Sequence, residues 1–162
     1  MIEKSNLSLI GMPGAGKSSL GPLLAKKLGK SFIDADSEVQ KAYEQETGRP
    51  ASDMSHSEFV ERENRFLIEL EIDNCVIAVG GRAIYCQEAM NHLAEISKIV
   101  YLEIDYETMR TRILKDQKLG KNFRRCKEED LRAVYDERLP LYEKISEQKL
   151  TLEQVEELLQ TS

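Results

Sequence analysis

Residues 11–18 read GMPGAGKS and satisfy every position of the phosphate-binding pattern G-x-x-x-x-G-K-[ST]. Glycines let backbone N–H groups close around phosphate oxygens, and the helix expected after the loop presents its positive end to the same anion. Lys17 can reach the β- and γ-phosphates, and the Ser18 hydroxyl can bind Mg²⁺. The loop therefore predicts binding of ATP or a similar triphosphate with Mg²⁺. We assign the nucleotide contacts to Gly11, Gly14, Ala15, Gly16, Lys17, Ser18 and Ser19.

The two segments that flank this loop are those that its chemistry requires. Residues 6–10 form an apolar run that enters the loop, and residues 19–28 carry apolar side chains at helical spacing after it. A chance match is the alternative, and the order strand, loop, helix argues against it.

Asp34 and Asp36 form an Asp-x-Asp pair after the next expected strand, residues 31–35. Beside a bound metal triphosphate, one such acid can orient Mg²⁺ through water, and the other can accept a proton from an attacking hydroxyl. Asp36 is also a good helix N-cap, because Ser37 and Glu38 follow it. We predict a catalytic role for at least one of the two acids, with helix capping as the alternative.

Alternating strand and helix patterns supply the scaffold for these residues. An apolar run at 74–79 stops at Gly80 and Gly81, as in a strand buried on both faces of a sheet. Further strands are expected at 98–104 and 148–151, and helices at 37–47, 58–72, 107–117, 128–142 and 152–159. The helix 128–142 should end near Leu139-Pro140, and Thr151 with Gln154 should form a capping box. The pattern predicts an α/β fold of three αβα layers, with a five-stranded parallel sheet and helices on both faces.

Parallel α/β sheets bind ligands at the carboxyl ends of their strands. We therefore expect one crevice to contain the phosphate loop, Asp34, Asp36, Gly80, Gly81 and Arg82. Residues 115–127 interrupt the helical pattern with six cationic residues. This segment is interpreted either as a solvated loop or as a lid that closes over the triphosphate.

The length of 162 residues suits one domain, here residues 1–162, with a substrate-binding segment at 37–62 and the lid at 115–127. The net charge of −6 argues against a nucleic-acid surface. The N-terminus has no long apolar stretch, so we expect no membrane partner and a cytoplasmic protein, and we expect it to be a monomer. Cys75, Cys86 and Cys126 fit reduced packing thiols, and His56 and His92 are interpreted as surface or loop side chains.

Four motifs together resemble the shikimate kinases, small relatives of the nucleoside monophosphate kinases. These are GMPGAGKS, F-I-D-A-D, V-I-A-V-G-G and D-L-R-A-V-Y-D-E-R-L-P-L-Y. The resemblance covers nearly the whole chain, and the Asp-x-Asp pair and the ending R-x-P-L-Y are its most particular parts.

The resemblance implies a role for each matching residue. Ser18 would bind Mg²⁺ with Asp34 behind it, and Asp36 would hold the substrate hydroxyl. Gly80 and Gly81 would let backbone approach the substrate, Arg138 would bind its carboxylate, and Arg112 would pack against adenine. The family's lid motif is missing, so the catalytic lid cation is sought among Lys121, Arg124 and Arg125.

The chain departs from the family at the acceptor site. In the family motif F-R-x-x-E a second carboxylate-binding arginine stands where this chain has Val60. The segment between Gly48 and Glu58 is also shorter, and the triplet G-G-G reads Gly80-Gly81-Arg82. We hypothesise that Arg82 returns the lost cation to the acceptor pocket; alternatively it points outward or contacts phosphate.

Three functions follow from these observations. Phosphorylation of shikimate at its 3-hydroxyl by MgATP is the leading one. The second is a related kinase of another hydroxy acid, polyol or nucleotide, which Val60 favours. The third is a nucleotide-binding regulatory module without transfer activity, against which Lys17, Asp36 and Arg138 argue.

Overall fold

The computed structural model describes residues 4–118 and 127–161. In this part of the chain the strands are β1 (Asn6–Ile10), β2 (Ser31–Asp34), β3 (Cys75–Ala78), β4 (Ser97–Glu103) and β5 (Gln148–Thr151). The helices are α1 (Lys17–Leu28), α2 (Ala35–Thr47), α3 (His56–Glu69), α4 (Gln87–Ile96), α5 (Tyr106–Lys118), α6 (Leu131–Ile145) and α7 (Leu152–Gln160). Short 3₁₀ helices are η1 (Ala51–Asp53), η2 (Gly81–Tyr85) and η3 (Glu128–Asp130).

The strands form one parallel sheet in the order β2-β3-β1-β4-β5. The register pairs Leu9 with Ala78 and Ile10 with Tyr101, so β1, β3 and β4 end at the same edge of the sheet. Asp34 also pairs with Ala78, which brings the end of β2 to that edge. The predicted five-stranded parallel α/β fold is therefore confirmed.

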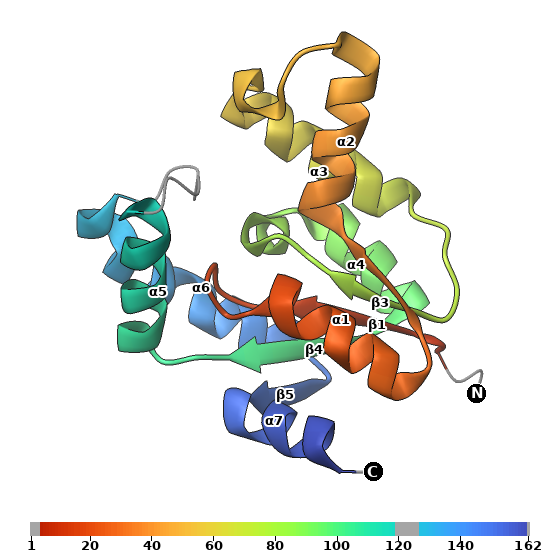
Figure 1. Ribbon diagram of the computed structural model, residues 1–162, viewed down its shortest axis with the longest axis vertical. Helices are drawn as coiled ribbons and strands as arrows, with labels where there is room; N and C mark the ends of the chain where they lie inside the picture. The colour runs from red at the N-terminus through yellow and green to blue at the C-terminus, as the bar shows by residue number, and fades with distance from the viewer. Residues whose placement is uncertain (1–3, 119–126, 162) are drawn as a thin grey trace.

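Helices cover both faces of the sheet (Figure 1). Helix α1 packs on β2 and β3 and contacts α7, whereas α4 and α6 pack on β4, and α3 packs on α4. Helix α2 and the first turns of α3 stand away from the sheet at the top of Figure 1. The longest helix described, α6, has 15 residues, and no helix in the described ranges is long and apolar enough to cross a membrane.

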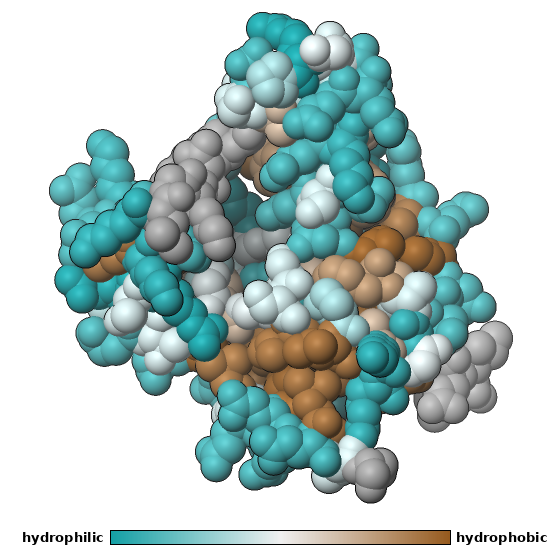
Figure 2. All heavy atoms as spheres, viewed as in Figure 1, coloured by the Kyte–Doolittle hydropathy of each residue, from teal (hydrophilic) through white to brown (hydrophobic). Residues whose placement is uncertain are grey.

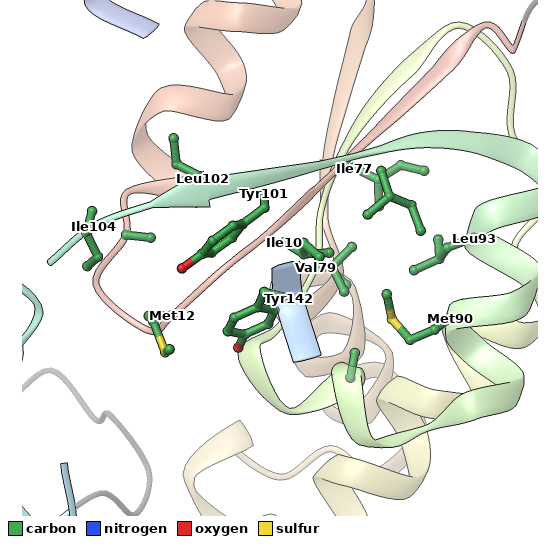
Figure 3. Packing of buried hydrophobic residues seen from close by; sticks show 14 of the residues in the cluster. Ile10, Met12, Ile77, Val79, Met90, Leu93, Tyr101, Leu102, Ile104 and Tyr142 are labelled. Carbon is green, nitrogen blue, oxygen red and sulfur yellow. The ribbon is translucent and has the colours of Figure 1, made fainter. Parts of the chain in front are cut away.

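The main core lies between the sheet and the helices on the α4 and α6 side, as Figure 3 shows for Ile10, Ile77 and Leu93. Tyr101 of β4 stacks on Tyr142 of α6, with ring centroids 5.3 Å apart. The Tyr142 hydroxyl donates to the Gly81 carbonyl at 2.8 Å. The core therefore fixes the position of η2, which follows β3 at the sheet edge.

One helix end was predicted wrongly and one helix was not predicted. The helix 128–142 does not end near Leu139-Pro140: α6 continues through Pro140 to Ile145. Proline costs a helical hydrogen bond, but burial of Arg138 and Tyr142 on the same helix outweighs this local preference. The helix that was not predicted is α4, which packs Met90 and Leu93 into the core. The Thr151–Gln154 capping box is confirmed.

Apolar side chains also gather on the outer surface. Figure 2 shows a hydrophobic area over α1. Leu23 and Leu28 of α1 and Leu158 of α7 are exposed. On the same face of the molecule, Figure 2 shows a hollow between the α2–α3 part and the side that carries α5.

Candidate active site

A cleft of about 740 Å³ lies at the carboxyl edge of the sheet, within the usual volume range of small-molecule sites. It brings together most residues that the sequence predicts for the site. These are Gly14, Gly16, Lys17, Ser18, Ser19, Asp34, Asp36, Gly80, Gly81, Arg82, Arg112 and Arg138.

The phosphate loop depends on glycine conformations at Gly14 and Gly16, whose φ angles are 82° and 99°. Gly16 is the N-cap of α1 and provides no side chain, so the first N–H groups of α1 have no side-chain cap. These groups form the expected anion-binding end of the helix.

Gly11 and Ala15 are not among the residues that line the cleft. A Cβ on Gly11 would lie 2.7 Å from the Leu102 carbonyl oxygen, so glycine is needed for the loop to pass β4. Ala15 is completely buried, and its N–H donates to the Met12 carbonyl at 3.1 Å. Both residues therefore fix the conformation of the loop without lining the cleft.

Lys17 is buried and donates from Nζ to the carbonyls of Gly11 (2.7 Å) and Met12 (2.9 Å). Burial lowers the pKa of Lys17 to about 8, although Asp36 opposes this shift. An anion in the cleft would restore the preference for the charged ammonium. The lysine is therefore preorganised beside the loop to meet a phosphate.

Ser18 and Asp34 are joined directly: the Ser18 hydroxyl donates to Asp34 Oδ2. The other oxygen, Asp34 Oδ1, accepts from the backbone N–H of Ser37 at 3.2 Å and caps α2. The predicted capping role of Asp36 is therefore wrong, because α2 already begins at Ala35 and Asp34 is its N-cap. A hydroxyl with a carboxylate behind it fits a magnesium site that keeps several waters.

Asp36, Glu63 and Gly80 converge at the centre of the cleft. A Cβ on Gly80 would lie 2.4 Å from Glu63 Oε2 and 2.8 Å from Asp36 Oδ1, so both carboxyl groups approach one point on the backbone. Neither of these two buried oxygens has a hydrogen-bond partner among the described residues. Burial, and then the neighbouring Asp36, raise the pKa of Glu63 well above its usual range.

Arg138 reaches the cleft from α6 and is only 7% exposed. Its Nη1 lies 3.0 Å from the position of a Cβ on Gly81, and its Nε donates to the Tyr85 hydroxyl at 3.3 Å. Burial disfavours the charge, but Tyr142 and Tyr85 outweigh burial and raise the pKa of Arg138. A guanidinium that is charged and fixed in position by hydrogen bonding can bind a carboxylate.

The remaining predicted cations occupy different positions. Arg112 donates from Nη1 to the Gly14 carbonyl at 2.8 Å, beside the phosphate loop. Arg82 is exposed and lines both the main cleft and a second cavity of about 490 Å³ that Val60 also lines. Of the predicted lid, residues 115–118 belong to the last turn of α5. Lys121, Arg124 and Arg125 lie outside the described residues, as does Cys126.

Among the cleft residues that sequence reasoning missed are His56 and Glu63, both on α3. His56 is half-buried at the start of α3, not a surface side chain, and its Nδ1 has no hydrogen-bond partner among the described residues. With Phe59 these residues follow the spacing i, i+3, i+7, which places them on one helix face. That spacing was the available signal. His92, by contrast, contacts the Leu70 carbonyl through Nε2 at 2.7 Å, away from the cleft.

Comparison with known families gives one consistent result. The model of the shikimate kinase family matches residues 13–161. Shikimate kinase 1 of Erwinia tasmaniensis is 34% identical over 149 residues, which cover 91% of this chain and 86% of that protein. Shikimate kinase 1 of Escherichia coli is 35% identical over the same length and coverage.

Solved structures agree with the sequence relatives. The shikimate kinase of Acinetobacter baumannii, solved in complex with shikimate, matches with a TM-score of 0.77 and 30% identity over 96% of this chain and 88% of that chain. The shikimate kinase of Aquifex aeolicus matches with a TM-score of 0.70 and 27% identity over 95% and 94% of the two chains. The resemblance inferred from the motifs is confirmed.

Proposed function

Because the chain belongs to the shikimate kinase family, we propose that it transfers the γ-phosphoryl group of ATP to a hydroxyl of shikimate, with ATP and Mg²⁺ as the nucleotide and metal. The observation that carries the proposal is the single cleft in which Lys17, Asp36 and Arg138 meet. Those side chains supply a phosphate cation, a carboxylate for the acceptor hydroxyl and a cation for an acceptor carboxylate.

Each residue has a defined task in this reaction. Asp36 orients the acceptor hydroxyl and takes its proton as the oxygen bonds to the γ-phosphorus and the bond to ADP breaks. Lys17 leaves the carbonyls of Gly11 and Met12 to neutralise charge on the β- and γ-phosphates.

The other predicted residues complete the nucleotide side and the acceptor side of the site. Ser18 and Asp34 hold the metal, which when bound neutralises the phosphate oxygens. Arg112 packs against adenine, and a cation among Lys121, Arg124 and Arg125 closes the site as part of the lid. Gly80, Gly81, Arg82 and Arg138 form the acceptor side, within a single domain whose substrate-binding segment is 37–62.

One observation favours a second acceptor within the same reaction class. Val60 and Arg82 line a cavity of about 490 Å³, and the motif F-R-x-x-E of the family has arginine at position 60. Losing one charge-assisted hydrogen bond costs about 1.5–3 kcal/mol, or about ten- to 150-fold in affinity. A hydroxylated acceptor with a different substituent at this position would avoid that loss.

The test is ADP release by the pure protein with MgATP, alone, with shikimate, and with a panel of hydroxy acids, polyols and nucleoside monophosphates. We expect turnover that depends on shikimate, abolished by Lys17→Ala. Turnover with another acceptor would select the second candidate. ATP binding without stimulation by any acceptor would overturn the proposal and favour a regulatory nucleotide-binding module.

We further propose that the protein acts as a cytoplasmic monomer that does not use nucleic acid as a partner. Its acidic net charge of −6 supports the absence of a nucleic-acid partner. Sedimentation velocity should give the mass of one chain, with and without added DNA.

A further inference from the structure

The side chain of Tyr85, at the end of η2, contacts the substrate-binding cation Arg138 in two ways. Its hydroxyl accepts a hydrogen bond from Arg138 Nε at 3.3 Å. Its ring faces the same guanidinium, with Arg138 Cζ 5.4 Å from the ring centroid, a distance typical of a cation–π contact. Tyr85 itself is 44% exposed, so the core does not require it at this position.

The contact with Tyr85 uses one edge of the guanidinium of Arg138. Tyr85 engages Nε, whereas Nη1 lies over Gly81 at the cleft. Arg138 is therefore held by Tyr85 of η2 and by the neighbouring Tyr142 hydroxyl, with Nη1 at the cleft. A side chain fixed in this way loses less conformational entropy when a carboxylate binds.

Tyr85 also lies close to position 60. Val60 of α3, Arg82 and Tyr85 line the same cavity of about 490 Å³. Valine at position 60 supplies no second cation for Arg138, whereas Tyr85 contacts Arg138 from η2.

We propose that Tyr85 is a positioning residue that holds Arg138 for the acceptor carboxylate and so offsets the arginine missing at position 60. This inference rests on the proposed role of Arg138 in acceptor binding. It predicts that Tyr85 affects acceptor affinity through Arg138 and leaves the nucleotide side unchanged.

Tyr85→Phe removes the hydroxyl and keeps the ring, and steady-state kinetics should show a KM for the acceptor raised about three- to tenfold, with the KM for ATP unchanged. Tyr85→Leu removes the ring as well and should raise the acceptor KM further. In an Arg138→Lys background, which lacks Nε, Tyr85→Phe should have no additional effect.

The matched control is Tyr106→Phe. Arg132 Cζ lies 4.7 Å from the centroid of the Tyr106 ring, outside the cleft, so this variant should leave both KM values unchanged. An unchanged acceptor KM in Tyr85→Phe, or an equal effect in the Arg138→Lys background, would overturn the proposal.

A second measurement separates this inference from the proposed reaction, because it needs no turnover. In ¹⁵N NMR spectra the Arg138 Nε–H signal, identified by its loss in Arg138→Lys, should exchange slowly with solvent in the wild type and faster in Tyr85→Phe. The same signal should stay slow in Tyr106→Phe. If the wild type fails to phosphorylate shikimate but the exchange difference is present, the proposed substrate fails and the positioning contact stands. Equal exchange in wild type and Tyr85→Phe would refute the contact.

Discussion

At the level of single residues, the cleft contains more buried or half-buried acids than buried cations. Asp34, Asp36 and Glu63 face two buried cations, Lys17 and Arg138. The family's arginine at position 60 would add a third cation, and Val60 does not. Burial, and then the neighbouring Asp36, raise the pKa of Glu63 although Lys17 opposes the shift, so Glu63 is only partly compensated.

Glu63→Gln should stabilise the protein in a pH-dependent manner. Folding raises the pKa of Glu63, so as pH rises above about 4.3 the unfolded chain loses this proton first and stability falls until pH passes the folded-state pKa. Below that window both states are protonated and the penalty is absent. We expect Glu63→Gln to be more stable than wild type at pH 8 by about 1–2 kcal/mol, with the advantage vanishing near pH 4.

Urea unfolding measured across this pH range checks the prediction. The control is Glu61→Gln on the same helix, because the Glu61 side chain is 71% exposed and pairs with Arg65 at the surface. Its effect should be small and nearly independent of pH. A loss of stability in Glu63→Gln at every pH would contradict the assignment of Glu63 as an only partly compensated buried acid.

Asp36→Asn should lower kcat by about 10²–10⁴-fold, because an amide cannot accept the proton of the acceptor hydroxyl. Asp36 takes no part in the hydrogen bond between Ser18 and Asp34, and the amide keeps the shape of the carboxyl group, so ATP affinity should change much less than kcat. Steady-state kinetics and calorimetric titration with MgATP measure the two quantities. Asp136→Asn, at an exposed carboxyl of α6, is the control. A variant that keeps kcat within tenfold of wild type would exclude Asp36 as the base.

At the scale of elements, the site depends on how closely the connection from β3 to η2 approaches α2 and α3. Gly80 has an ordinary extended conformation, with φ −61° and ψ 148°, so backbone strain does not explain the glycine. Three carboxyl oxygens within 2.8 Å of its Cβ position do explain it. The absence of a side chain lets Asp36 and Glu63 reach the end of β3.

Gly80→Ala should therefore damage the acceptor site while sparing the nucleotide site. The new methyl group would displace Asp36 and Glu63, and kcat/KM for the acceptor should fall by about 10²-fold or more, because small misplacements at a reacting centre are costly. Gly29→Ala is the contrasting variant: nothing lies within 4 Å of its Cβ, but its φ is +67°. It should lose about 1–2 kcal/mol of stability and keep its kinetic constants. Equal kinetics for Gly80→Ala and wild type would show that the carboxyls can move without consequence.

Over the whole molecule, the cleft is lined by segments with two proposed tasks: the phosphate loop and α1 for the nucleotide, and η2, α3 and α6 for the acceptor. The loop, α1 and the end of β2 carry Lys17, Ser18 and Asp34, whereas α3 carries His56 and Glu63. Ligands that bind in this cleft bridge segments far apart in the chain. Binding should therefore stabilise the fold as a unit.

MgATP at about 100 times its Kd should add about 2.7 kcal/mol to the free energy of unfolding, which corresponds to about 5–11 °C in Tm for a domain of this size. Differential scanning fluorimetry measures the shift. Lys17→Ala should reduce it strongly, whereas Leu23→Ala, at an exposed position of α1, should keep it. A wild-type Tm that is the same with MgATP and with buffer alone would contradict nucleotide binding in the cleft.

The predictions from sequence that succeeded rest on local patterns of residue types. The pattern from Gly11 to Ser18 needs particular residue types at fixed spacing, so it could be predicted directly. The alternation of strand and helix patterns led to a parallel sheet at whose carboxyl edge Asp34, Gly80 and Arg82 lie, whereas Arg138 was predicted from the family motif. Predicted element bounds were less reliable because neighbouring elements compete with local signals. Asp34 rather than Asp36 caps α2, and burial of Tyr142 carries α6 past Pro140.

The proposed donor half of the site could be predicted from the sequence alone, because phosphate binding uses backbone groups and side chains that are adjacent in the chain. On the acceptor side, Arg138 could be predicted from its motif, but the approach of His56, Glu63 and Tyr85 from α3 and η2 became apparent only in the folded chain. Which charged groups Glu63 meets, and which side chains contact Arg138, depend on distances across the cleft. Residue spacing along one chain cannot encode such distances, since they arise when α3, η2 and α6 pack around the same sheet edge.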